Sequence, residues 1–414
     1  MIVKSFLLTQ DTLQRIAAQC GEDTVAIIRP ENQIEKLLRE AIGITLREKK
    51  SAAREFEAIR AYFDALSQTP QYRETVAQTV DGLSAYLRES MYIQMADHAV
   101  DDYVMAKCAR LCAEAVNSVV KGTLIDGTEL MICHTAQHFD WLSSRDQILA
   151  RIPASGPVVI PGGYGRLKTG YVVRVGKDGA HLMASLIGAT LKADSVTFFV
   201  EGPGVAGVPA MTYDEAAHYC ASSRPPFSSY AIWPAKNANI PIVVKDILDD
   251  GFDGTVISTA SVHGTGILQD QDLDLITVYG TGLLGRVGMS SSIFSALARE
   301  HVNVRFIAQT SSEYSISFAV RSKDKDVTLA AIRSLFQQNP LLPLDDVVVL
   351  NQAVGIVTIF GSKMRNLPGT SAAVYSKLGE AGINIIASAQ GGEELSISLV
   401  VAEEDTAKVA ALLQ

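Results

Sequence analysis

The sequence predicts an α/β protein: an amino-terminal αβα sandwich with a mainly parallel sheet, followed by two ferredoxin-like α+β domains. Three observations predict it. Strand and helix patterns alternate over about residues 1–255, residues 31–121 are mostly helical in pattern, and residues 270–414 contain an internal repeat. We expect the domains to span residues 1–258, 262–340 and 341–414.

Composition sets the class of protein. Hydrophobic residues make up 48% of the 414 residues and charged residues 20%, which is typical of a globular protein. The net charge of −9 disfavours nucleic acid and anionic membrane surfaces as partners, and no apolar run is long enough for a membrane helix. Without a signal-peptide pattern, a cytoplasmic location is expected. Five scattered cysteines and seven dispersed histidines predict neither a disulfide framework nor a metal site.

The elements of the first domain follow from local patterns. MIVKSF and TVAIIRP predict strands on either side of a helix in TQDTLQRIAAQ, and IEKLLREAIGITL and FEAIRAYFDAL have helical periodicity. PVVIPGGYG predicts a buried strand that enters a glycine turn, AHLMASLIGATLKA a buried helix, and SVTFFV and IPIVVKDI two more strands. Thr212, with Glu215 three residues on, predicts a capping box at a helix start.

The internal repeat has a constant offset of 81 positions. Gly288 falls on Gly369, Gln309 on Gln390, and the SIS at 315–317 on the SIS at 396–398. Each copy predicts strand, glycine turn, helix, strand, strand and helix, which is the split βαβ arrangement. Two such sheets could pair edge to edge and so protect their edges.

The repeat also predicts a binding site for a free amino acid. The turn at 282–290 would present N–H groups at a helix N-terminus to a carboxylate, and we expect the amides of Asn303 and Gln309 at the same end of the sheet. The alternative is that the glycines serve only the turn and the amides only cap backbone, but duplication favours a ligand-sensing pair. The candidate effector-binding residues are Gly282, Val287, Gly288, Met289, Ser290, Asn303, Val304, Gln309, Asn384 and Ile385.

The repeat resembles the tandem ACT domains of aspartokinases, most closely in GTGLLGRVGMSSSIFSALAREHVNVRFIAQTSSEYSISFAV. Upstream, IGATLKADSV, MTYDEAA and IPIVVKDILDDGFDGTVIS resemble segments of that family's amino-acid-kinase domain, in the same order. The resemblance covers nearly the whole chain. It implies an ACT pair that binds lysine or threonine, and either a homodimer through the ACT domains or a hetero-oligomer with an active aspartokinase.

The phosphate-binding segments depart from the family's pattern. Where aspartokinases have KFGGTS, Lys4 matches the lysine, but SFLLT at residues 5–9 replaces the rest of the motif. Leu7 and Leu8 bring apolar bulk near the expected phosphate. Both glycines, which would let backbone approach a phosphate, are absent. At the family's S-x-G-E helix start only a carboxylate is retained, on Asp102.

The segment that matches GRGGSDYTA is residues 176–184, and it is altered as well. Lys177 keeps a positive charge without the fork of arginine, Ala180 removes a hydroxyl, and His181 replaces a carboxylate. Asp178 adds a negative charge where the phosphate should lie.

In the segment that resembles TDVDGVYTADPR, residues 200–209, the Tyr, Asp and Arg of YTADPR have no counterparts, and Trp233 stands where FGAKVLHP has its His. What the resemblance leaves as catalytic remnants is Lys4, Lys177 and Asp102. The nucleotide- or substrate-binding candidates are Gly162, Gly163, Gly176, Gly179, Glu201 and Gly204.

Together these changes favour a catalytically weak or inactive aspartokinase homologue of the lysine, threonine and methionine pathway, acting as an amino-acid-sensing regulator. No cofactor would then be tightly bound. The alternative is an active aspartate kinase that uses ATP–Mg to phosphorylate the side-chain carboxylate of L-aspartate. An acidic ligand could also meet the basic residues near the GGYG turn, although a solvated basic loop is the favoured interpretation. These residues are Arg166, Lys168, Arg174 and Lys177. Nothing in the sequence directly supports a scaffold or storage role.

Overall fold

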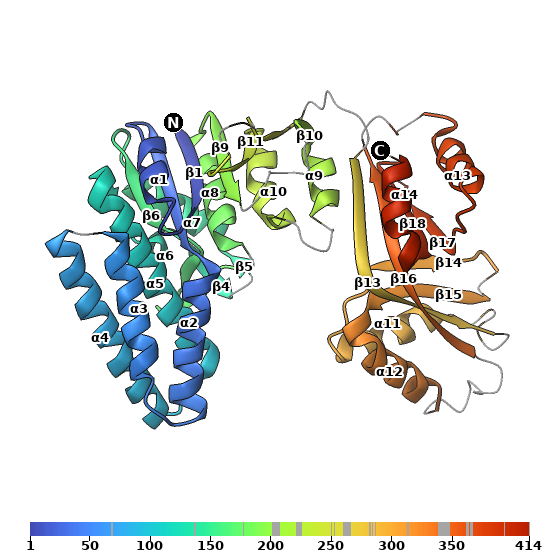
Figure 1. Cartoon of the computed structure of the whole chain (residues 1–414), viewed down its shortest axis with the longest axis horizontal. Helices are drawn as coiled ribbons and strands as arrows, with labels where there is room; N and C mark the ends of the chain where they lie inside the picture. Colours follow the sequence, from blue (N-terminus) through green and yellow to red (C-terminus); the bar gives the residue numbers. More distant parts are fainter. Residues whose placement is uncertain are drawn as a thin grey trace. The chain divides into compact units, whose positions relative to one another are not determined.

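The computed structural model divides the chain into two compact units at residues 263/264, each described here by itself (Figure 1). It describes all residues except 68, 136–137, 177, 201–207, 221–225, 250, 252, 260–265, 281–282, 284, 286, 313, 338–347, 362–363, 365–366, 393 and 414. No helix among the described residues is long and apolar enough to cross a membrane.

The first unit is built on an eight-stranded sheet with the order β10-β12-β11-β9-β1-β2-β6-β3. All its pairs are parallel except β11 with β12. Its strands are β1 (Ile2–Leu8), β2 (Thr24–Pro30), β3 (Thr123–Leu124), β6 (Val158–Pro161), β9 (Ser195–Val200), β10 (Ala210–Thr212), β11 (Ile242–Asp246) and β12 (Thr255–Ser258). A smaller sheet, β5-β4-β7-β8, contains β4 (Ile132–Thr135), β5 (His138–Phe139), β7 (Tyr164–Leu167) and β8 (Val172–Arg174).

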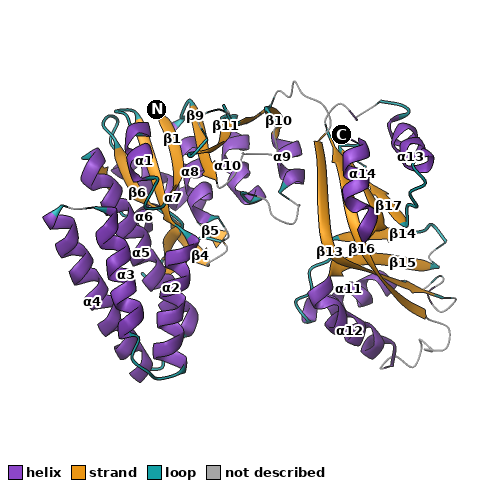
Figure 2. Cartoon of the chain, viewed as in Figure 1, coloured by secondary structure: helices purple, strands orange, loops and turns teal. Residues whose placement is uncertain are grey.

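Helices cover both faces of the large sheet, each over its own apolar cluster (Figure 2). One layer contains α1 (Leu13–Gln19), α2 (Asn32–Ile42), the π-helical turn Gly43–Arg47, α3 (Ala53–Leu66), α4 (Pro70–Tyr92) and α5 (Asp97–Val120). The other side has α6 (Gly127–Leu130), α7 (Trp141–Arg151), α8 (Gly179–Leu191), α9 (Tyr213–Tyr219) and α10 (Ser229–Ala238). Residues 179–188 of α8 are all buried, as expected for a helix that is apolar all round.

The second unit is one six-stranded antiparallel sheet with the order β14-β15-β13-β16-β18-β17. Its strands are β13 (Gly266–Tyr279), β14 (Phe306–Gln309), β15 (Ser315–Arg321), β16 (Val348–Phe360), β17 (Ala387–Gln390) and β18 (Ser396–Ala402). Its helices are α11 (Met289–Arg299), α12 (Lys325–Gln337), α13 (Thr370–Glu380) and α14 (Thr406–Leu413), with short 3-10 turns at Ser322–Asp324 and Glu403–Asp405.

Two long strands, β13 and β16, are shared by both copies of the repeat. Residues 273–279 of β13 pair with β15, whereas, among the described residues, its first residues, 266–270, pair only with the end of β16. The start of β16 likewise continues the sheet of the first copy, while residues 354–360 pair with β18. Each copy therefore has four antiparallel strands, and the two copies share β13 and β16.

The two edge strands of this sheet, β14 and β17, contact each other, so the sheet curls back on itself. Its inner face carries an apolar cluster that includes Leu273, Phe306 and Val354. The outer face packs against the helices through Ile276 and Val278 in the first copy.

A buried carboxylate pins β13 at the bulge between the two copies. The Asp270 side chain is 11% exposed, and its two oxygens lie 2.7 Å from Arg305 Nη2 and 2.9 Å from Arg321 Nη1. The repeat has Asn351 at the matching position, so the second copy lacks this clamp.

The fold class expected from the sequence is confirmed, with an αβα unit followed by ferredoxin-like copies. The capping box of Thr212 and Glu215 at the start of α9 is confirmed as well.

Candidate functional site

A cavity of about 230 Å³ opens at the carboxyl ends of β2 and β6, next to the start of α8. Ligands of open parallel sheets bind at this edge. Of the residues proposed from the sequence, the cavity brings together Gly162, Gly163, Gly179 and Arg174. Sequence reasoning placed Asp178 and Ala180 in a family motif without proposing them as ligands, and it missed Arg29, Pro30, Asn32, Glu35 and Tyr164.

The cavity has cationic and anionic walls. Glu35 lies 3.9 Å from Arg174 and 3.5 Å from Arg39, and Arg39 lies 3.4 Å from Asp101. Asp102 accepts the backbone N–H of Arg174, and burial raises the pKa of its carboxyl. A small ligand with both charges suits such walls.

The glycines at the cavity are explained by close packing. A Cβ on Gly162 would lie 2.5 Å from Cγ2 of Ile27, and one on Gly179 would lie 3.0 Å from the Cα and carbonyl oxygen of Gly163. The first turn of α8 is thus pressed against the turn after β6. Gly176 does not line the cavity but has φ +59°, which favours glycine.

The end of β1 is closed by the chain's own side chains. β1 continues through Leu7 and Leu8, in register with Arg29 and Pro30 of β2, and these leucines are 6% and 0% exposed. The Thr12 hydroxyl accepts the N–H of Thr9 at 2.8 Å and donates to the Leu7 carbonyl at 3.2 Å. The backbone N–H groups that would bind a phosphate here are therefore already bonded within β1 and the turn that follows it.

Lys4 lies away from this cavity. Its Nζ donates to the carbonyl of Gln19 at 2.7 Å and to Oε1 of Gln19 at 3.0 Å, at the C-terminal end of α1. A cation there is favoured by the helix dipole, so Lys4 has a sufficient structural role.

Three buried polar side chains lie between α8 and β1–β9. The side chains of Ser5, His181 and Ser185 are at most 1% exposed, and their polar atoms lack hydrogen-bond partners among the described residues. The His181 ring packs against the ring of Phe198, the partner of Ser5 on the neighbouring strand, with centroids 4.6 Å apart and an interplanar angle of 35°. Burial, and then the charge of Arg29, hold the pKa of His181 well below its usual value, so the ring is neutral.

The remaining sequence candidates of this unit are scattered. Lys177, Glu201 and Gly204 lie outside the described residues. Lys168 forms an ion pair with Asp140 at 2.9 Å, and Arg166 does not line the cavity. No group of three or more His, Cys, Asp or Glu that could hold a metal occurs in the described part of the chain.

In the second unit the two copies preserve one polar arrangement. Gly288 and Gly369, with φ +87° and +93°, are the N-caps of α11 and α13. Ser290 Oγ lies 3.4 Å from Gln309 Oε1, and the equivalent Ser371 Oγ lies 3.2 Å from Gln390 Oε1. In the second copy this pair borders a cavity of about 560 Å³.

The expectation that Asn303 and Gln309 share one end of the sheet is wrong within a single chain. Gln309 ends β14 beside the start of α11, whereas Asn303 follows the end of that helix, because helix and strand run in opposite directions. Asn384 is displaced in the same way from Gln390.

The other effector candidates also differ in placement. Val287 is fully exposed, Met289 is buried in the core of the first copy, and Val304 and Ile385 pack partly against the two cores. Gly282 lies outside the described residues.

Comparisons with known proteins agree with this architecture, an amino-acid-kinase-like domain followed by paired ACT domains. Residues 276–336 and 357–414 match the model of the ACT domain family. Over its full length the chain superposes on Escherichia coli aspartokinase III in complex with lysine and aspartate (TM-score 0.81, 17% identity, 98% of that chain). It also superposes on Clostridium acetobutylicum aspartate kinase (TM-score 0.80, 17% identity, 98% of that chain).

The relatives found by sequence include aspartokinases and bifunctional aspartokinase/homoserine dehydrogenases. The chain is 31% identical to the chloroplastic bifunctional aspartokinase/homoserine dehydrogenase of Daucus carota, over 55% of this chain and 27% of the relative. It is 26% identical to aspartokinase 2 of Bacillus subtilis, over 63% and 66% of the two chains. The match thus spans about a quarter of the bifunctional relative. The chain is an aspartokinase homologue with ACT domains.

Proposed function

We propose that this aspartokinase homologue senses a free amino acid through its ACT pair and has little or no phosphotransferase activity. The observation that carries the proposal is the closed end of β1. Leu7 and Leu8 are buried there, and the Thr12 hydroxyl accepts a hydrogen bond from the N–H of Thr9.

Phosphoryl transfer relies on positioning and on stabilising charge. Desolvating phosphates against two leucines would leave their charge without compensation. The predicted catalytic cation Lys4 is already bound at the end of α1, and buried His181 is a neutral group where the family has a carboxylate. These features argue against a kinase reaction at this edge.

The ACT unit favours sensing, because both copies keep an open helix N-terminus with a Ser–Gln pair. A carboxylate at such an N-terminus is stabilised by N–H groups and by the helix dipole. We expect lysine or threonine as the effector, bound in a homodimer formed through the ACT domains or in a hetero-oligomer with an active aspartokinase.

One observation favours the second candidate, an active aspartate kinase. Asp102 still contacts Arg174 at a cavity next to the start of α8. This enzyme would need ATP–Mg and would transfer the γ-phosphate to the side-chain carboxylate of L-aspartate.

Two measurements distinguish the amino-acid sensor from the active kinase. They are isothermal titration of the purified chain with ATP–Mg, lysine and threonine, and an assay of ADP release in the presence of aspartate. The proposal expects amino-acid binding without ATP binding, and no ADP release above background. An active aspartokinase assayed in parallel is the positive control. ATP binding that strengthens with aspartate would overturn the proposal in favour of the kinase.

A further inference from the structure

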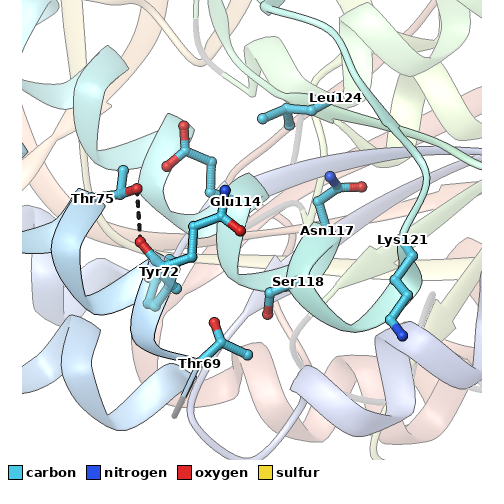
Figure 3. A pocket seen from close by; sticks show the side chains of 9 residues that line it. Thr69, Tyr72, Thr75, Glu114, Asn117, Ser118, Lys121 and Leu124 are labelled. Atoms are coloured by element: carbon cyan, nitrogen blue, oxygen red, sulfur yellow. Dashed lines mark hydrogen bonds between the residues drawn. The ribbon is translucent and has the colours of Figure 1, made fainter.

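A second polar cavity, of about 440 Å³, lies between the start of α4 and the end of α5 (Figure 3). It belongs neither to the cavity at the sheet edge nor to the ACT unit. Tyr72 and Thr75 border it from α4, with Thr69 just before that helix. Glu114, Asn117 and Ser118 border it from α5, with Lys121 just after that helix.

The α5 face carries opposite charges at its two ends. Glu114 and Lys121 are seven residues apart, which is about 10 Å along a helix. Glu114 is 17% exposed, and only its Oε1 is bonded to Arg110, at 2.9 Å. Among the described residues, the exposed Lys121 ammonium has no ion-pair partner.

Between these charges the cavity lining suits a ligand with polar ends and an apolar middle. Asn117 Oδ1 accepts the N–H of Gly122 at 3.0 Å, which leaves the amide NH₂ as a donor near Lys121. The Tyr72 hydroxyl donates a hydrogen bond to the carbonyl oxygen of Leu111. The Tyr72 ring and the side chain of Leu124 therefore offer apolar contact to a ligand.

We propose that this cavity binds a linear ω-amino carboxylate, with its ammonium at Glu114 and its carboxylate at Lys121 and Asn117. The spacing of about 10 Å between the two residues along the helix suits a ligand with four or five methylenes between its charged ends. Each charged end then forms a charge-assisted hydrogen bond. The proposal is independent of amino-acid sensing by the ACT pair.

The test is isothermal titration of the full chain with 6-aminohexanoate, compared with hexanoate and hexylamine. We expect saturable 1:1 binding of 6-aminohexanoate, and at least tenfold weaker binding of the two compounds that lack one end. Lys121→Met and Glu114→Gln should each weaken binding at least fivefold. Lys192→Met is the matched control, because Lys192 also follows a helix in the left-handed conformation and is exposed.

Saturable binding that Lys121→Met leaves unchanged would overturn the proposal, as would the absence of saturable binding. Lys121→Met carries the test alone if Glu114→Gln weakens the fold, because Lys121 is exposed. Ser371→Ala should not change 6-aminohexanoate binding, since this compound lacks the α-ammonium group. Loss of binding in Ser371→Ala would place the site in the ACT unit instead. Failure of lysine and threonine to bind the ACT unit would leave this result unaffected.

Discussion

The two units treat their ligand-facing turns in opposite ways. In the first unit, buried leucines close the end of β1, a hydrogen-bonded threonine closes the turn that follows, and the glycines beside α8 are used for packing. In the second unit, the glycine N-caps of α11 and α13 have open space around them, and the same Ser–Gln pair occurs twice. A fold can therefore keep its core while one set of turns closes and another stays open.

The largest effect is expected from removing both leucines that close β1. Leu7→Ala and Leu8→Ala should each cost about 2–5 kcal/mol of unfolding free energy, because buried leucines leave cavities when truncated. Urea unfolding of the single and double variants measures this. A cost below about 1 kcal/mol would mean that the turn can open, which would break the comparison. Exposed Leu149→Ala is the control, with an expected change within about 0.5 kcal/mol.

Asp270→Ala should cost about 3–5 kcal/mol, because it leaves Arg305 and Arg321 without their buried carboxylate. Asn351→Ala, at the matching but exposed position of the other copy, should change stability by about 0.5 kcal/mol or less. Urea unfolding compares the two. Equal costs would show that the clamp does not distinguish the copies.

His181 should make the first unit sensitive to acid. Its pKa is lowered in the folded state, so below about pH 6.5 the unfolded chain binds a proton that the folded chain does not. Stability is then lost at about 1.4 kcal/mol per pH unit until the pH reaches the folded-state pKa. His181→Phe should abolish this part of the slope in unfolding measurements between pH 7 and 5.

Ser185→Ala is the control for that prediction. It removes a buried hydroxyl one helical turn away without removing a titratable group, so the slope should persist. If both variants have the wild-type slope, His181 does not titrate on unfolding.

The smallest effect on stability is expected in the ACT unit. Ser371→Ala removes a hydrogen bond between partly exposed side chains, so unfolding free energy should change by about 0.5 kcal/mol or less. The rise in Tm on adding the effector should nevertheless decrease, because that hydroxyl borders the cavity. An unchanged rise would exclude the second copy as an effector site and leave the first.

Much of the fold could be predicted because periodicity and the repeat are local signals. The capping box at Thr212 and the helical run before β3 needed no partner from elsewhere in the chain. The site was harder, since Arg29 reaches the cavity through its strand register and Glu35 through the packing of α2. Asn303 was misplaced because spacing along the chain did not give the direction of the returning strand.

The shared strands of the second unit also determine when it can fold. Gly266 pairs with Phe360, so the start of β13 has no partner until a residue 94 positions later in the chain has been synthesised. Such non-local pairing slows folding and leaves an unpaired edge exposed on the growing chain. Neither copy can complete its sheet before β16 has emerged, so a nascent chain that stalls within residues 280–340 would be prone to aggregate.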